Sequence, residues 1–195
     1  MNKKGYIILG GIILFIALLF MLDRIDNDAI RFSREYKGVP KENVFVYKNI
    51  DEIIKIMEHG TGIVYLGFPD CPWCRAYVKY LNEVAIEEGI EKIYYCNILE
   101  DRKNNTKEYQ KIVELLGDNL QYDEEGNLRV YVPNVSFHIK GEVIGNDYET
   151  SYDTKGYKDP KDYWTNDRVD DLKKRLTEYM EDVYVALNSC TDCNK

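Results

Sequence analysis

Basic residues and histidines are scarce in this chain of 195 residues. Lysine and arginine number 26 against 34 acidic residues, which gives a formal net charge of −8. Without a basic stripe the chain lacks the phosphate contacts that supply most nucleic-acid affinity, so we do not expect a nucleic acid as partner. The two histidines, His59 and His138, stand apart from the cysteine motifs described below, and we expect both to be structural.

Charge is absent from one long stretch, residues 6–22 (YIILGGIILFIALLFML). The Ile, Leu and Phe residues of this run favour membrane insertion by about 4 to 7 kcal/mol before the glycines are counted. Lys3 and Lys4 resemble the start of a signal peptide, but the run is long for one and lacks a small-x-small cleavage site. No cysteine precedes Cys71, which excludes a lipid-modified cysteine after the run. We predict an uncleaved signal anchor, with cleavage near the end of the run as the alternative.

The predicted anchor divides the chain into four parts. Residues 1–22 form a transmembrane helix, 23–43 a charged stalk, 44–188 a folded domain and 189–195 a tail. Basic residues flank the anchor on both sides, so their distribution does not predict the orientation of the span in the membrane. Long domains, however, cross membranes largely regardless of their charge. We therefore expect a single-pass protein of the cell membrane whose domain lies on the extracytoplasmic side.

Short apolar strands alternate with amphipathic helices between residues 44 and 187. Strands are predicted at residues 44–47, 63–68, 93–98 and 128–132, followed by a hairpin of 135–139 and 142–144. Helices are predicted after the capping box of Asn49 and Glu52, over 71–88, after the cap Thr106, and over 166–187. The inward face of the last helix is predicted to contain Val169, Leu172, Leu176, Met180, Val183 and Leu187. This order predicts an α/β fold with a mixed sheet flanked by helices.

The five cysteines include two C-x-x-C pairs, Cys71/Cys74 and Cys190/Cys193. A random order of the residues would give about 0.1 such pairs. The tail pair is either a second redox pair that exchanges with Cys71 or a partner, or a local disulfide or two idle thiols. Cys96 lies in a predicted buried strand, so we expect a small core residue. The two C-x-x-C pairs of a structural zinc site are usually about 15–20 residues apart. The two pairs of this chain are much farther apart, so we expect no metal, and we expect no other cofactor.

The pair Cys71/Cys74 follows a buried strand and begins a helix. Unpaired amides and the dipole at a helix N-terminus stabilise a thiolate, which favours Cys71 as nucleophile and Cys74, one turn on, as its resolving partner. Pro72 suits the first helical position and removes one amide donor. Arg75 adds positive potential near Cys71, whereas Asp70 opposes thiolate formation.

Three segments follow a known pattern: Phe68–Arg75 (FPDCPWCR), Tyr131–Pro133 (YVP) and Phe137–Val143 (FHIKGEV). Together they resemble the thioredoxin superfamily, and the likeness covers about residues 44–187. The resemblance implies a thioredoxin-like fold, with a cis proline at Pro133 beside the redox pair. It also implies that substrate is bound along Pro72, Trp73, Val132 and Pro133.

More narrowly, the chain resembles the thioredoxin-like bacteriocin transport accessory proteins. These share a long segment between the redox pair and the proline, and a polar loop with Asp-Pro, here Asp159–Pro160. One departure from thioredoxins concerns the buried acid that stands six residues before their first cysteine and moves the proton of the second. Tyr65 stands at that position here. Proton transfer at Cys74 must then use water or another group, which implies a slow or specialised exchange.

These observations predict a membrane-anchored thiol–disulfide oxidoreductase that exchanges disulfides with protein substrates. Cys71 would attack the substrate and Cys74 would resolve the mixed disulfide, with a membrane redox partner or a peptide exporter as a further partner. The alternative is a non-enzymatic accessory or peptide-binding module in which the disulfide between the two cysteines is structural. Its recognition surface would be a loop with the aromatic residues Tyr148, Tyr152, Tyr157, Tyr163 and Trp164.

Overall fold

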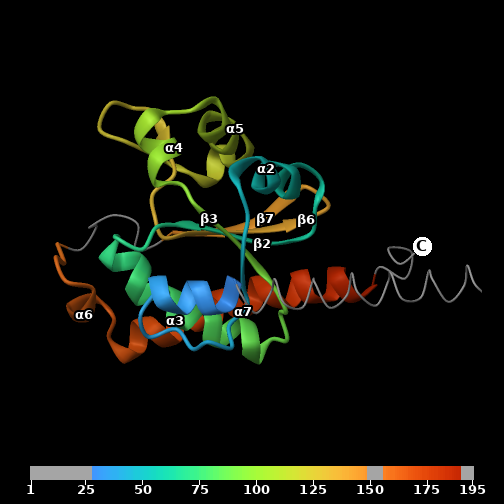
Figure 1. The fold of residues 1–195 in the computed structure, drawn as a ribbon, viewed down its shortest axis with the longest axis vertical. Helices are drawn as coiled ribbons and strands as arrows, with labels where there is room; N and C mark the ends of the chain where they lie inside the picture. The colour runs from blue at the N-terminus through green and yellow to red at the C-terminus, as the bar shows by residue number, and fades with distance from the viewer. Residues whose placement is uncertain (1–27, 149–155, 190–195) are drawn as a thin grey trace, which may run out of the picture.

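The computed structural model describes residues 28–148 and 156–189. These residues form a five-stranded sheet with helices on both faces (Figure 1). The strands are β1 (Phe45–Tyr47), β2 (Gly62–Gly67), β3 (Ile93–Asn97), β6 (Asn134–Ile139) and β7 (Glu142–Asp147). A separate two-stranded ribbon consists of β4 (Gln121–Tyr122) and β5 (Leu128–Arg129).

The sheet is mixed, and its strands follow the order β1-β3-β2-β6-β7. β1 and β2 pair with β3 in parallel, whereas β6 pairs antiparallel with both β2 and β7. All six residues of β2 are buried, because this strand has a neighbour on each side and helices over both faces. The predicted α/β fold with a mixed sheet is thereby confirmed.

The helices cover the sheet in two groups. In Figure 1, α3 (Pro72–Glu87) and α7 (Asn166–Ser189) lie on one face, and α2 (Ile50–His59) and α5 (Lys107–Leu116) lie on the other. Two short helices, α4 (Leu99–Asn104) and α6 (Pro160–Tyr163), were not predicted. The predicted capping box of Asn49 and Glu52 is present, and Thr106 caps α5.

The predicted inward face of α7 is confirmed over most of the helix, where the buried residues are Leu172, Leu176, Met180 and Val183. It is wrong for Leu187, which is 49% exposed. The last turns of α7 extend past the sheet (Figure 1), and Leu187 lines an open hollow with Ile90 and Tyr94 instead of packing in the core. The predicted strand over 128–132 is also too long, because β5 ends at Arg129.

The segment 23–43 is predicted to be a stalk, but its described part belongs to the folded core. Residues 28–35 are helical, and Phe32 and Tyr36 are fully buried. Phe32 stacks on Phe45 of β1 with the ring centres 3.9 Å apart. Ala29, Phe32 and Tyr36 follow helical spacing, and the many charges between them occupy the other faces of the helix.

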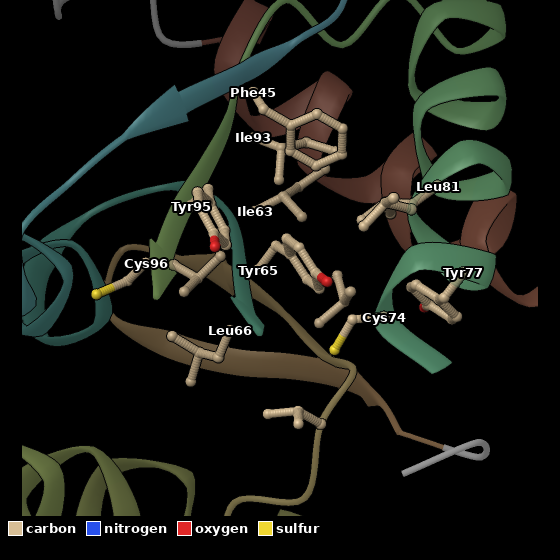
Figure 2. Packing of buried hydrophobic residues seen from close by; sticks show 14 of the residues in the cluster. Phe45, Ile63, Tyr65, Leu66, Cys74, Tyr77, Leu81, Ile93, Tyr95 and Cys96 are labelled. Carbon is tan, nitrogen blue, oxygen red and sulfur yellow. The ribbon is translucent and has the colours of Figure 1, made fainter. Parts of the chain in front are cut away.

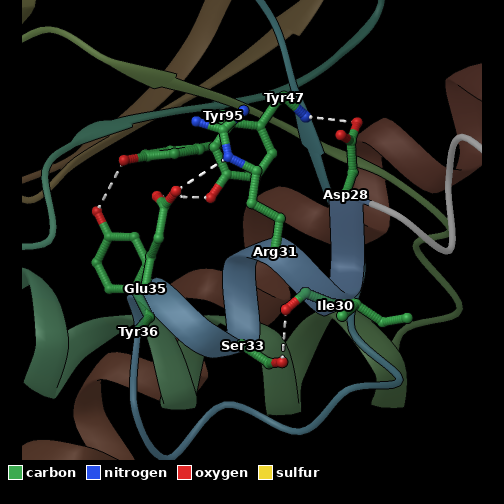
Figure 3. A network of polar contacts seen from close by, with 8 residues as sticks. All are labelled: Asp28, Ile30, Arg31, Ser33, Glu35, Tyr36, Tyr47 and Tyr95. Atoms are coloured by element: carbon green, nitrogen blue, oxygen red, sulfur yellow. Dashed lines mark hydrogen bonds and ion pairs between the residues drawn. The ribbon is translucent and has the colours of Figure 1, made fainter.

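Polar contacts also fix this helical segment to the edge strand β1 (Figure 3). The Tyr47 amide donates a hydrogen bond to the Asp28 carboxylate over 3.0 Å, and the Tyr47 hydroxyl donates one to Glu35 over 2.7 Å. Glu35 in turn pairs with Arg31 at 2.9 Å. The segment therefore packs beside the edge strand β1 and binds one of its backbone amides, which an edge strand otherwise leaves unpaired.

The predicted anchor at residues 6–22 and the tail pair Cys190/Cys193 lie outside the described residues. Among the helices of residues 28–148 and 156–189, none combines the length and the apolar character needed to cross a bilayer.

Candidate redox site

Cys71 lies where the chain leaves the buried centre of the sheet and begins a helix. It follows β2 after a short turn and caps α3, with Pro72 as the first helical residue. The Cys74 amide donates a hydrogen bond to the Cys71 sulfur over 3.2 Å. The free amides of the first helical turn therefore point at this sulfur, as the sequence predicted.

The two thiols of the pair differ in exposure and acidity. Cys71 is 8% exposed and Cys74 is fully buried, and both are free cysteines. A hydrogen bond with the Cys74 thiol, together with the amides of Cys74 and Trp73 and the charge of Arg102, lowers the pKa of Cys71 to about 7 against the opposing effect of burial. Cys71 is therefore substantially a thiolate near neutral pH.

Cys74 has the opposite character. Burial and the neighbouring Cys71 raise the pKa of its thiol well above the usual value, while the Phe68 backbone and the Tyr65 hydroxyl act in the other direction. A thiol of this kind stays protonated until the sulfur beside it has reacted. Two thiols with opposite pKa shifts thus lie within one helical turn.

The segment with Val132 and Pro133 lies against Cys71. The peptide bond between these two residues is cis, as expected from the resemblance. The Cys71 thiol lies 3.9 Å from the Val132 carbonyl oxygen, to which it donates. β5 ends early because residues 130–133 leave the β4–β5 ribbon and pass the cysteines before β6 begins. The structure therefore brings together two segments that are some 60 residues apart in sequence.

Arg102 is a residue of this site that sequence reasoning missed. It comes from α4, which forms no part of the C-x-x-C motif, and its guanidinium lies over the Phe68 ring. Its Nη1 donates to the Val130 carbonyl oxygen at 3.5 Å. Arg75, the cation predicted from spacing, instead donates to the Pro69 carbonyl oxygen at 2.7 Å. No local pattern marks Arg102, because its position depends on how α4 packs.

Aromatic residues of the predicted recognition loop pack beside the site. The Trp73 ring meets Tyr163 edge-on at 5.4 Å, and Tyr163 is buried. The Arg168 guanidinium lies over the rings of both Tyr157 and Tyr163. The exposed Pro72 and the half-buried Trp73 lie between the two cysteines in the sequence, so the contact of Trp73 with Tyr163 places α6 close to the redox pair. Tyr152 of the same loop lies outside the described residues.

The remaining candidates lie elsewhere. Cys96 is buried in β3, where burial raises the pKa of its thiol to about 12, so the prediction of a core residue is confirmed. His59 is exposed at the end of α2. His138 is buried in β6 with its Nε2 at 2.8 Å from the Ser136 hydroxyl. Across the described residues, no three His, Cys, Asp or Glu side chains lie close enough together to hold a metal ion.

Comparison of the chain with protein-family models, with curated proteins and with solved structures finds no match.

Proposed function

We propose that this protein is a thioredoxin-like thiol–disulfide oxidoreductase that acts on protein substrates through Cys71 and Cys74. The observation that carries the proposal is the contrast between the two sulfurs: Cys71 caps a helix and has a lowered pKa, whereas the pKa of the fully buried Cys74 is raised. A structural disulfide needs no such contrast, whereas a nucleophile with a resolving partner does.

The proposed reaction has two exchange steps. The Cys71 thiolate attacks a substrate disulfide, forms a mixed disulfide with one substrate sulfur and releases the other as a thiolate. Cys74 then loses its proton and attacks the Cys71 sulfur, which breaks the mixed disulfide and releases the second substrate sulfur. The dithiol of the protein is oxidised to a disulfide, the substrate disulfide is reduced to two thiols, and the reverse sequence would oxidise a substrate.

The residues around Cys71 support a place for the substrate chain. The backbone of Val132 lies beside the sulfur, just before β6, and offers an extended peptide backbone groups to pair with. Pro72 and Trp73 border the same place from the helix side. We propose that these residues hold the substrate chain in line with the Cys71 sulfur.

Insulin reduction with a small dithiol as electron source tests the proposal. The wild-type protein should accelerate the reduction of insulin, and Cys71→Ser should abolish this acceleration. Cys74→Ser should accumulate a mixed disulfide with the substrate. Cys96→Ser is the matched control and should keep full activity, because Cys96 is buried away from the pair. Undiminished turnover in Cys71→Ser would overturn the proposal. A reduction potential below about −300 mV would instead favour a structural disulfide in an accessory module.

The place of action is part of the proposal. We propose that residues 6–22 hold the domain at the extracytoplasmic face of the cell membrane, since the run has the length and composition of a single span. Protease added to intact cells should then digest the domain, while removal of residues 1–22 should release it from the membrane fraction. Protection of the domain in intact cells would contradict this orientation.

A further inference from the structure

Tyr65 carries a buried hydroxyl that the proposed reaction does not yet use. The side chain comes from the middle of β2 and is fully buried. Among the described residues, its hydroxyl oxygen has no partner at hydrogen-bond geometry. A buried hydroxyl without a partner destabilises a fold, because it loses its hydrogen bonds to water and gains none. A phenylalanine would avoid this loss, so the hydroxyl calls for an explanation in the chemistry around it.

The packing of aromatic rings determines where this hydroxyl lies. The Tyr65 ring stacks on Tyr95 at 5.4 Å and meets Tyr36 edge-on at 6.3 Å. Gly67 leaves room for the hydroxyl, since a Cβ at that position would lie 2.5 Å from its oxygen. Figure 2 shows the Tyr65 hydroxyl directed towards α3 and the Cys74 thiol. The ring is thus held in one orientation, with its hydroxyl on the side of the resolving sulfur.

Cys74 needs a hydrogen-bond donor at the moment it reacts. Its sulfur is removed from water, and a thiolate formed there has no solvent to stabilise it. The titratable and charged groups that act on this sulfur come from every element around it: Cys71 at the start of α3, Tyr65 of β2, Tyr95 of β3, Arg102 of α4, and Tyr36 after the helical residues 28–35. Of the tyrosines, Tyr36 donates to Tyr95 over 3.1 Å, whereas the Tyr65 hydroxyl acts on both Tyr36 and the Cys74 sulfur. Tyr65 is therefore the tyrosine whose donor can turn to that sulfur.

We propose that the Tyr65 hydroxyl donates a hydrogen bond to the Cys74 sulfur as it becomes a thiolate, and thereby speeds the resolving step. This inference rests on the proposed function. Burial and the neighbouring Cys74 raise the pKa of Tyr65 well above its usual value, so the phenol keeps its proton and acts as a donor and not as a base. The proton that leaves Cys74 is balanced by the substrate thiolate released in the first step, which takes up one proton, and the electron pair of the broken disulfide leaves with the second substrate sulfur.

The reduced protein can be tested in one turnover with 5,5′-dithiobis(2-nitrobenzoate). The full-length chain in detergent, with Cys96, Cys190 and Cys193 replaced by serine, leaves only the pair to react. Attack by Cys71 releases one thionitrobenzoate and leaves the other attached to Cys71. Attack by Cys74 on that mixed disulfide releases the second. Stopped-flow absorbance separates the two phases, and each is followed as a function of pH.

Tyr65→Phe should slow the second release about tenfold and move its pH midpoint upwards by about one unit, with the first release unchanged. The unchanged first phase also shows that the variant is folded. Tyr77→Phe is the matched control: Tyr77 is equally buried and lies on the helix of Cys74, but its hydroxyl donates to Asp147, so both phases should be as in the parent.

Two other results are informative. A second release in Tyr65→Phe with the rate and pH midpoint of the parent would overturn the role of Tyr65 and leave the proposed function standing. A parent protein that releases the first equivalent but never the second has no resolving step, and this result would overturn the proposed function together with the inference.

Discussion

The guanidinium carbon of Arg102 lies 5.0 Å from the centre of the Phe68 ring, and this contact holds a cation beside the turn that leads to Cys71. Burial and the nearby Arg129 lower the pKa of Arg102, but an arginine remains charged under all ordinary conditions. The charge therefore contributes to the low pKa of Cys71, after the larger effects of Cys74 and the helix amides.

Removal of this charge should make Cys71 less acidic. In Arg102→Met the pKa of Cys71 should rise by about half a unit, because a nearby positive charge favours the thiolate. The pH dependence of alkylation by iodoacetamide, measured with the other cysteines replaced by serine, reports this pKa directly. Arg102→Lys keeps the charge and serves as the control. Identical profiles for the Met and Lys variants would show that the charge of Arg102 does not contribute to the low pKa of Cys71.

The acidity of Cys71 can also be followed without a reagent. As pH rises, thiolate absorbance in the ultraviolet should appear with a midpoint near 7 in the reduced protein, since the pKa of Cys71 is about 7. Cys71→Ser should lack this transition, while Cys74→Ser should keep a thiolate transition because the helix amides still point at Cys71. A single midpoint near that of a free cysteine would contradict the assignment of Cys71 as nucleophile.

His138 should make the folded state sensitive to acid. Burial lowers its pKa to about 4, below the value of an exposed histidine. As pH falls, the unfolded chain therefore takes up a proton before the folded one does. The stability due to neutral His138 is complete above about pH 6.5 and is lost as the pH falls towards 4. Between pH 7 and pH 4.5, the free energy of unfolding measured with urea should fall by about 2 kcal/mol more in the wild type than in His138→Gln. Parallel losses in both proteins would contradict this account.

Phe32 should matter for stability as much as a residue at the centre of the sheet. Phe32→Ala removes a fully buried ring that stacks on Phe45 and Tyr36, so the free energy of unfolding should fall by about 4 kcal/mol. Arg34→Ala changes an exposed side chain of the same helical segment and should alter stability by less than about 0.5 kcal/mol. Denaturant titration compares the two, and a small effect of Phe32→Ala would restore the stalk interpretation.

The elements that sequence predicts well are those with local signals. Asn49 with Glu52, Thr106, and Pro72 after Cys71 mark helix starts through contacts within one turn. The buried strand β2 is also predicted well, because its apolar run is short, lies between two glycines and contains β-branched and aromatic residues. The same local logic identifies the cysteine pair, because both partners lie in one helical turn.

The features that sequence misses depend on contacts between distant segments. Arg102 reaches the site only because α4 packs beside Phe68, and Tyr36 faces Tyr95 from a segment whose charges suggest a linker. The direction of the Tyr65 hydroxyl is equally hidden, since it depends on the absence of a side chain at Gly67 and on the rings of two other elements. Packing across the sheet, which no spacing rule encodes, decides all three.

The burial of Phe32 against β1 limits how far from a lipid surface the redox pair can work. If residues 6–22 cross a bilayer, as we propose, only residues 23–27 separate the span from the described fold. A fully extended chain of five residues reaches at most about 18 Å. The domain would then lie close to the lipid headgroups with little freedom to search the surrounding space. Its natural partners would be proteins that present their cysteines within this thin layer, such as membrane proteins or chains emerging from an exporter.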